Sequence, residues 1–227
     1  MQKSNRFGKQ LRTLLLKEIQ LEWRARYVLN GVLLYLVSSI FVIYLSFQLN
    51  GVSIEPVVWN ILFWIVQLFT AFNIVAKSFF QERYNRFFYY YTLFSPEVLI
   101  ISKIIYNTLL MAGIGLLGML VFVVIMGNPI QDIAGFLICL VSASVGFSST
   151  LTMVSGIASK AGNNTTLLAI LGFPVILPLL LMTLRLSKNA IDGLDFSLQA
   201  DKLLVIWAIN LLTTALATLL FPYIWRS

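Results

Sequence analysis

Residues 133–159, IAGFLICLVSASVGFSSTLTMVSGIAS, contain no Asp, Glu, Lys or Arg. A helix rises 1.5 Å per residue and the hydrocarbon core of a bilayer is about 30 Å thick, so about 20 apolar residues cross it. A charge at the centre of such a helix costs roughly 2.5 to 3.5 kcal/mol on the insertion scale. An uncharged stretch of this length avoids that cost, and the sequence therefore predicts a transmembrane helix here.

Five further stretches share this length and this lack of charge. They are residues 28–49, 57–76, 104–126, 166–184 and 203–225. Hydrophobic residues make up 59% of the 227 residues and the mean hydropathy is +0.88, which lies above the range of a soluble domain. We therefore expect an all-α integral membrane protein with six transmembrane helices, forming a single domain over residues 1–227.

The distribution of charge predicts the orientation of these helices. Of the 16 Lys and Arg, only Arg185, Lys188 and Lys202 fall on one side of the predicted topology. By the positive-inside rule, the side with the other basic residues is cytoplasmic. Both termini are then expected in the cytoplasm, and residues 185–202 are expected to form an extracytoplasmic loop.

Residues 1–27 form a basic segment before the first apolar stretch. Its apolar side chains at helical spacing are Leu15, Leu16, Ile19 and Trp23. The polar residues opposite them are Lys17, Gln20 and Arg24. This pattern is typical of an amphipathic helix on a membrane surface, and we expect an elbow helix packed beside the bundle. The alternative is a leader whose charges only set the orientation.

The connection at residues 78–102 carries aromatic side chains at helical spacing. They are Phe80, Tyr84, Phe87, Phe88 and Tyr91, with Glu82, Arg83 and Arg86 among the polar residues. The spacing predicts a short cytoplasmic helix. We expect the next helix to begin at Pro96, because Pro suits the first helical position behind a Ser cap. On these residues alone, a helix resting on the headgroups is favoured over one that inserts into a soluble partner.

Small residues and prolines suggest how the helices pack. Gly146 and Gly156 lie among the Ser and Thr residues of 133–159 and permit close approach of neighbouring helices. Gly172, Pro174 and Pro178 predict a kink or an interrupted helix near mid-membrane. Packing is the default interpretation of the two glycines in 133–159. A kink at the other three residues can serve gating, although many membrane helices bend without moving.

The chain lacks the residues that most membrane enzymes and carriers use. It contains no His, so it offers no imidazole to haem or zinc or for acid-base catalysis. The predicted spans contain no carboxylate, which disfavours a proton-coupled carrier, and Cys139 is the single cysteine. There is no G-x-x-x-x-G-K-[ST] loop and no nucleic-acid-binding module. We expect a non-catalytic chain without a metal site; any ATP must be hydrolysed by a separate subunit.

Residues 144–181, SVGFSSTLTMVSGIASKAGNNTTLLAILGFPVILPLLL, resemble the haem exporter protein B family. Members of this family are the permease subunits of the cytochrome c maturation ABC transporter. Phe94, Ser95 and Pro96, followed by residues 98–103, resemble a second part of the family pattern. With the predicted helices aligned, the resemblance covers residues 11–225. The family often has an acidic cytoplasmic segment where this chain has Gln81 to Arg86.

The resemblance implies an ABC-2-like permease in a bacterial cytoplasmic (inner) membrane. The implied coupling residues are Phe80, Glu82, Arg83, Tyr84, Arg86, Phe87, Phe88, Tyr91 and Pro96. They would contact an ATP-binding cassette subunit, which binds the ATP, in a complex with a haem-handling membrane subunit. The complex would handle haem, and this chain would bind no cofactor itself. Alternatives are an ABC-2 permease for another substrate, such as a lipid or drug, and a membrane scaffold without a transport cycle.

Overall fold

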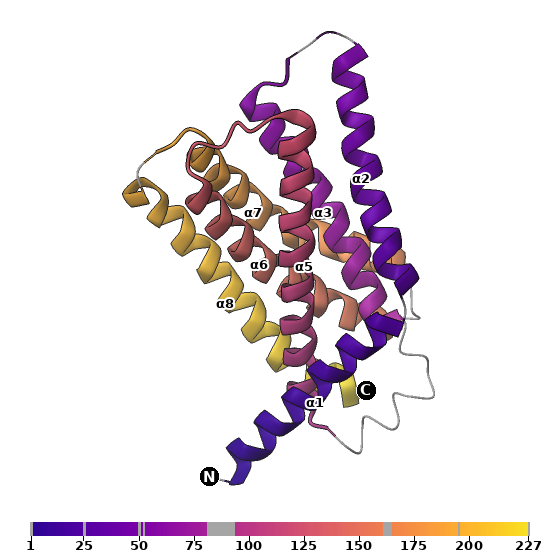
Figure 1. Cartoon of the computed structure of the whole chain (residues 1–227). Coiled ribbons are helices and arrows are strands. Elements are labelled where there is room, and N and C mark those ends of the chain that lie inside the picture. The colour runs from indigo at the N-terminus through magenta and orange to yellow at the C-terminus, as the bar shows by residue number, and fades with distance from the viewer. Residues whose placement is uncertain are drawn as a thin grey trace.

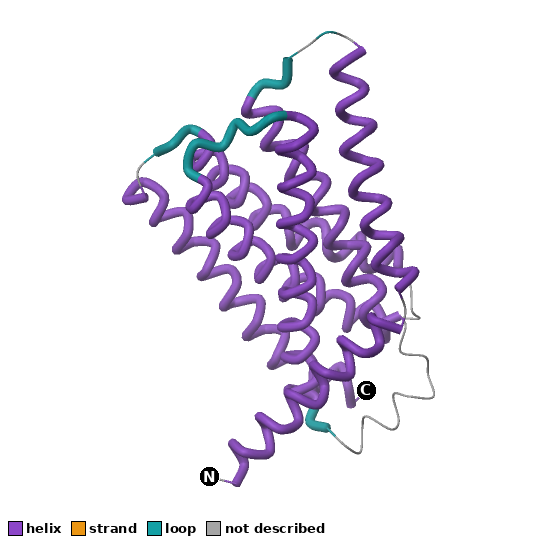
Figure 2. Tube along the Cα trace, viewed as in Figure 1, coloured by secondary structure: helices purple, strands orange, loops and turns teal. Residues whose placement is uncertain are grey.

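The protein is built from long helices. The computed structural model describes residues 2–24, 26–49, 51, 53–80, 94–160, 165–194 and 196–226. In these residues the helices are α1 (Gln2–Arg24), α2 (Arg26–Leu49), α3 (Pro56–Phe80), α5 (Pro96–Met126), α6 (Ile133–Lys160), α7 (Thr165–Ile191) and α8 (Phe196–Arg226). The described residues contain no strand (Figure 2). Six of these helices, all except α1, are long and apolar enough to cross a membrane. The all-α fold class and the predicted number of spans are confirmed.

The six long helices run alongside one another, and α1 crosses one end of the bundle (Figure 1). Both chain termini lie at this end, which we call the terminal end. The connections from α2 to α3, from α5 to α6 and from α7 to α8 lie at the other end, which we call the opposite end. The bundle therefore has the alternating up-and-down order that six consecutive spans require.

Helix α6 is the centre of the bundle. It packs against α3, α5, α7 and α8, and 72% of its most apolar stretch is buried. Its many Ser, Gly and Ala residues allow neighbouring backbones to come close. Helix α2 lies at the periphery: only 17% of its most apolar stretch is buried, and Leu34 and Val42 are among its exposed side chains. Large aliphatic side chains on such a face suit contact with lipid.

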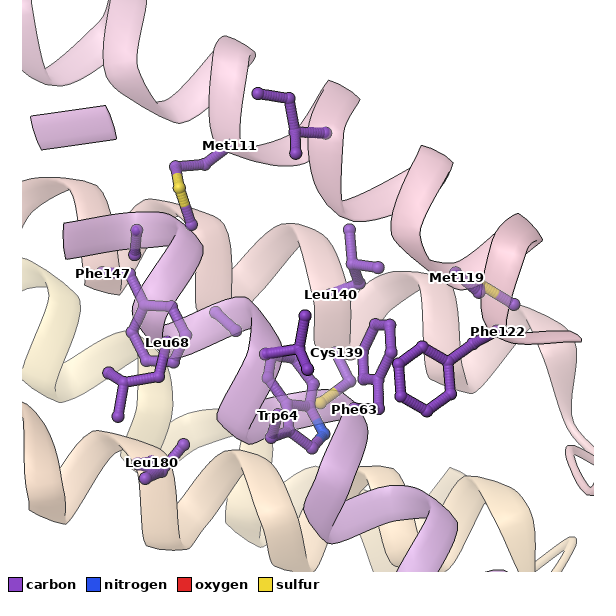
Figure 3. Packing of buried hydrophobic residues seen from close by; sticks show 14 of the residues in the cluster. Phe63, Trp64, Leu68, Met111, Met119, Phe122, Cys139, Leu140, Phe147 and Leu180 are labelled. Atoms are coloured by element: carbon purple, nitrogen blue, oxygen red, sulfur yellow. The ribbon is translucent and has the colours of Figure 1, made fainter. Parts of the chain in front are cut away.

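Aromatic rings from three helices fill the core (Figure 3). Trp59 and Phe63 of α3 stack with ring centroids 5.5 Å apart, and Phe122 of α5 packs edge-on against both, at 5.3 and 5.6 Å. Phe136 of α6 lies 5.4 Å from Phe63. Edge-to-face and offset-stacked rings attract one another beyond their burial. This cluster joins α3, α5 and α6.

The third span starts earlier than its uncharged stretch. Helix α5 begins at Pro96, behind Ser95 in an extended conformation with φ −73° and ψ 142°, so the predicted helix start is confirmed. The expected span began at residue 104 because Lys103 interrupts the apolar run. In the structure Lys103 is buried inside α5, which continues without a break to Met126.

The fifth span is also longer than expected. Helix α7 runs unbroken from Thr165 to Ile191 with Pro174 and Pro178 inside it, so the helix is not interrupted at its prolines. Proline is tolerated in membrane helices because neighbouring groups satisfy the freed carbonyls. Residues 185–191 belong to α7 and residues 196–202 to α8, so the predicted loop at 185–202 is mostly helical.

Candidate functional site

Most of the predicted coupling residues lie outside the described residues. Glu82, Arg83, Tyr84, Arg86, Phe87, Phe88 and Tyr91 all fall in residues 81–93. The backbone of Phe80 ends α3, and Pro96 occupies the first turn of α5. The predicted cytoplasmic helix therefore stays a prediction, while the elements that flank it are placed.

The first turns of α5 are packed between α1 and α8. Val98, Leu99, Ile100 and Ile104 of α5 form one buried cluster. The cluster also contains Leu14 of α1 and Ala217 and Phe221 of α8. Burial of apolar side chains in this way anchors the start of the third span at the terminal end.

The side of α1 that packs on the bundle contains Leu14 and Glu18, while two residues of the predicted apolar face are exposed. Leu14 is 2% and Glu18 is 8% exposed, whereas Leu16 and Ile19 are 48% and 49% exposed. Hydrophobic periodicity predicted Leu16 and Ile19 on a shared apolar face but could not say what that face contacts. The bundle contact instead includes a carboxylate, because Lys103 of α5 lies opposite it.

This charged contact was missed by the sequence analysis. Lys103 Nζ lies 3.3 Å from Glu18 Oε1, and Lys17 Nζ lies 3.4 Å from the same oxygen. In the sequence, Lys103 stands directly before an uncharged apolar stretch, a position typical of the boundary of a span. Its partner is far away in the chain and could not be inferred from spacing.

Uncharged polar contacts join α5 to α6. Ser148 Oγ donates to the carbonyl oxygen of Ile104 at 2.8 Å. Asn107 Nδ2 donates to Thr152 Oγ1 at 3.0 Å. Hydrogen bonds between membrane helices contribute about 0.6 kcal/mol on average, so two of them one turn apart give a modest but directional connection.

Helix α8 is joined to α6 in the same manner. Asn210 Nδ2 donates to the carbonyl oxygen of Ser142 at 2.9 Å. The hydroxyl oxygens of Ser149 and Thr213 lie 2.9 Å apart. The Ser- and Thr-rich pattern of α6 predicted close packing. In the structure these side chains bond α5 and α8, and Ser155 also donates to the carbonyl oxygen of Val75 of α3 at 3.5 Å.

Two of the predicted packing glycines lie at tight helix contacts. A Cβ at Gly146 would meet Asn210 Oδ1 of α8 and a methyl group of Leu179 of α7. A Cβ at Gly172 would lie 3.0 Å from the ring of Phe72 and 3.1 Å from Leu151. A side chain at Gly146 would force Asn210 or Leu179 to move, and one at Gly172 would need Phe72 and Leu151 to give way slightly.

The remaining predicted packing residues are placed differently. Gly156 is buried in α6, and its carbonyl oxygen accepts a hydrogen bond from Ser159 Oγ at 2.8 Å. Pro174 and Pro178 are exposed on the outside of α7. The structure thus brings Gly146 and Gly172 into helix interfaces and leaves the two prolines on the surface of the bundle.

A third polar contact joins α3 to α7. Trp64 Nε1 donates to Ser187 Oγ at 2.8 Å, and Ser187 Oγ lies 2.8 Å from Asn60 Oδ1. Asn60 Nδ2 in turn donates to the carbonyl oxygen of Leu184 at 3.0 Å. This contact could not be predicted from the sequence, because Asn60 lies in an otherwise apolar stretch and Ser187 falls in the predicted loop at 185–202.

The contacts described above join helices through packing, hydrogen bonds and charge pairing. Among the described residues, no three of His, Cys, Asp and Glu gather where they could hold a metal ion. Cys139 is buried, and its Sγ contacts the carbonyl oxygen of Thr183 at 3.5 Å. What this arrangement can do is hold helices together in defined pairs.

Fold and site together define a multi-pass α-helical membrane protein whose central helix is bonded to its neighbours by uncharged polar groups. Comparisons with known protein families, with curated proteins and with solved structures find no match to this chain.

Proposed function

We propose that the chain is the permease subunit of an ABC transporter complex that delivers haem for c-type cytochrome biogenesis. The observation that carries the proposal is the packing of α1 and α8 around the first turns of α5. These turns follow directly after the predicted coupling residues, so a subunit that binds those residues acts on a buried junction of three helices. The resemblance of residues 144–181 to the haem exporter protein B family supports the haem assignment.

The charge distribution supports a cytoplasmic position for the terminal end. Lys9, Arg12 and Lys17 lie on α1 at this end, and Arg185 and Lys188 lie toward the end of α7 at the opposite end (Figure 1). Positive residues are retained in the cytoplasm during insertion. An ATP-hydrolysing subunit in the cytoplasm could then reach the connection between α3 and α5, with the protein in the bacterial inner membrane.

The hydrogen bonds suggest which helices move together. Helix α6 bonds α5 through Asn107 and Ser148 and bonds α8 through Asn210. ATP binding by the partner would displace the coupling residues and rock α5, α6 and α8 as one unit. This motion would either translocate haem or release a haem-loaded chaperone from a membrane partner. An imidazole ligand for haem would come from another chain, because this one has no His.

Association with the ATPase tests the coupling residues. The Phe87→Ala/Phe88→Ala variant should co-purify with less of the ATP-binding subunit and should reduce cytochrome c maturation, because aromatic side chains commonly dominate binding energy. The matched control is Phe41→Ala, which removes an exposed ring from α2. Undiminished association together with unchanged maturation would reject this coupling site.

A gene deletion separates the substrate hypotheses. We expect loss of covalent haem staining in c-type cytochromes and recovery when the gene is restored. Normal staining would reject the haem assignment; a permease for a lipid or drug would then be tested through the genes beside it. Full function with a hydrolysis-deficient ATPase would indicate a membrane scaffold instead.

A further inference from the structure

Helices α1 and α5 meet through charged groups as well as apolar ones. Lys103 is buried in the part of α5 that is apolar enough to cross a membrane. Its ammonium group lies 3.3 Å from Glu18 Oε1 of α1. An ionisable side chain at such a position is unfavourable unless it is paired, and it commonly marks a functional position.

A second polar pair lies one turn further along both helices. The hydroxyl group of Tyr106 on α5 hydrogen bonds with Glu22 on α1. Glu18 and Glu22 are four residues apart and therefore lie on one face of α1. Lys103 and Tyr106 are three residues apart and lie on one face of α5. We call these four residues the α1–α5 contact. It continues the apolar cluster that contains Leu14, one turn before Glu18.

The α1–α5 contact specifies one register. Apolar helix faces can slide or rotate with little change in buried area, whereas a buried charge loses its partner when the helix shifts by a turn. Removing one partner of a buried ion pair is strongly unfavourable, because the other charge stays buried without compensation. Polar groups at helix interfaces are best known for fixing register in this way.

We propose that Glu18 and Lys103, supported by Glu22 and Tyr106, fix α1 on the first turns of α5 so that the two helices move as one rigid unit. This inference rests on the proposed function in one respect. If the ATP-binding subunit displaces the start of α5, the movement is transmitted to α1. Leu16 and Ile19 lie on the exposed side of α1, so movement of α5 would displace an apolar surface against the bilayer interface.

The first experiment measures attachment of α1 without reference to transport. Leu14→Cys in a Cys139→Ala background gives the full-length protein one thiol, at a buried position. In lipid nanodiscs we expect Glu18→Lys and Lys103→Glu each to raise the rate of labelling by a hydrophilic maleimide by about tenfold or more, because each places like charges together. The double variant Glu18→Lys/Lys103→Glu should return the rate close to that of the parent.

A reporter at an exposed position provides the control. Lys9→Cys lies on the exposed surface of α1 and should be labelled at the same rate in all of these charge variants. Unchanged labelling of Leu14→Cys in both single variants would overturn the proposal. So would a double variant that is labelled as fast as the single ones.

The second experiment tests movement as one unit. Glu18→Cys/Lys103→Cys, also in the Cys139→Ala background, removes the ion pair and should lose activity in cytochrome c maturation. A bifunctional thiol reagent that joins the two positions should restore activity, and a monofunctional reagent should not. Full activity before joining, or no recovery after it, would overturn the proposal. If the parent protein itself proves unnecessary for maturation, the proposed function fails, and the labelling experiment alone decides whether the α1–α5 contact fixes α1.

Discussion

Gly146 shows how one missing side chain positions two helices. Its backbone lies against Asn210 of α8 and Leu179 of α7, and Asn210 also bonds the carbonyl oxygen of Ser142 one turn earlier in α6. The small residue and the amide therefore depend on each other: the hydrogen bond needs the close approach that glycine allows. The sequence predicted a packing glycine at this position but could not identify Asn210 as its neighbour.

We expect Gly146→Ala to destabilise the protein by about 1–3 kcal/mol, because the added methyl group forces α7 or α8 outward. The measurement is unfolding of the purified protein in detergent mixtures. Gly113→Ala is the matched control, since a Cβ at Gly113 meets nothing within 4 Å. Equal stability of the two variants would show that the contact at Gly146 relaxes without cost.

At the scale of elements, helix α7 is held at two levels. Gly172 packs on Phe72 of α3 and Leu151 of α6, and Ser187 bonds Trp64 and Asn60 of α3 nearer the opposite end. Pro174 and Pro178 lie between these levels but face outward. Ile176, between the two prolines, is buried in the core, so α7 also packs on the bundle through this segment while its prolines face outward.

Replacing Ser187 by Ala should weaken the connection between α3 and α7. We expect a loss of about 0.6–2 kcal/mol in unfolding free energy, because the indole of Trp64 and the amide of Asn60 lose a buried partner. Thr218→Ala is the control, since the Thr218 hydroxyl bonds to carbonyl oxygens of its own helix. A double-mutant cycle with Asn60→Ala measures the coupling, and strictly additive losses would contradict a direct connection.

The sequence predicted elements better than contacts. Uncharged stretches located six spans because the bilayer requires their length and composition, which are local properties. The start of α5 at Pro96 was also local and was found, whereas the extent of the span was not, because Lys103 appeared to end it. Its pairing with Glu18 depends on tertiary structure. The same limit applies to α1, where periodicity revealed an amphipathic helix but not the side that packs on the bundle.

The whole molecule has two chemically different ends. The terminal end combines α1, the start of α5 and most of the basic residues in the sequence. The opposite end carries the connection from α7 to α8, where Lys188 and Asp192 form an exposed ion pair at 2.9 Å. An exposed pair of this kind contributes little to stability, so the difference between the ends concerns orientation rather than folding.

Thiol accessibility in intact cells tests this orientation. In the Cys139→Ala background we expect Lys188→Cys to react with a membrane-impermeant maleimide added outside. Lys9→Cys, Arg83→Cys and Lys160→Cys should react only after the cells are opened, because basic residues mark the cytoplasmic side. Reaction of Arg83→Cys and Lys160→Cys from different sides would refute the six-span topology.

The distance in sequence between Glu18 and Lys103 affects how the chain is made. The two residues are separated by 85 positions, so the ribosome completes α1 and two spans before the lysine exists. Until then the Glu18 carboxylate cannot pair with Lys103, and α1 remains at the membrane surface without this contact. Once synthesised, Lys103 must enter the bilayer next to α1, which is already at the membrane. During synthesis, α1 can therefore form its ion pair with α5 only when the third span is inserted.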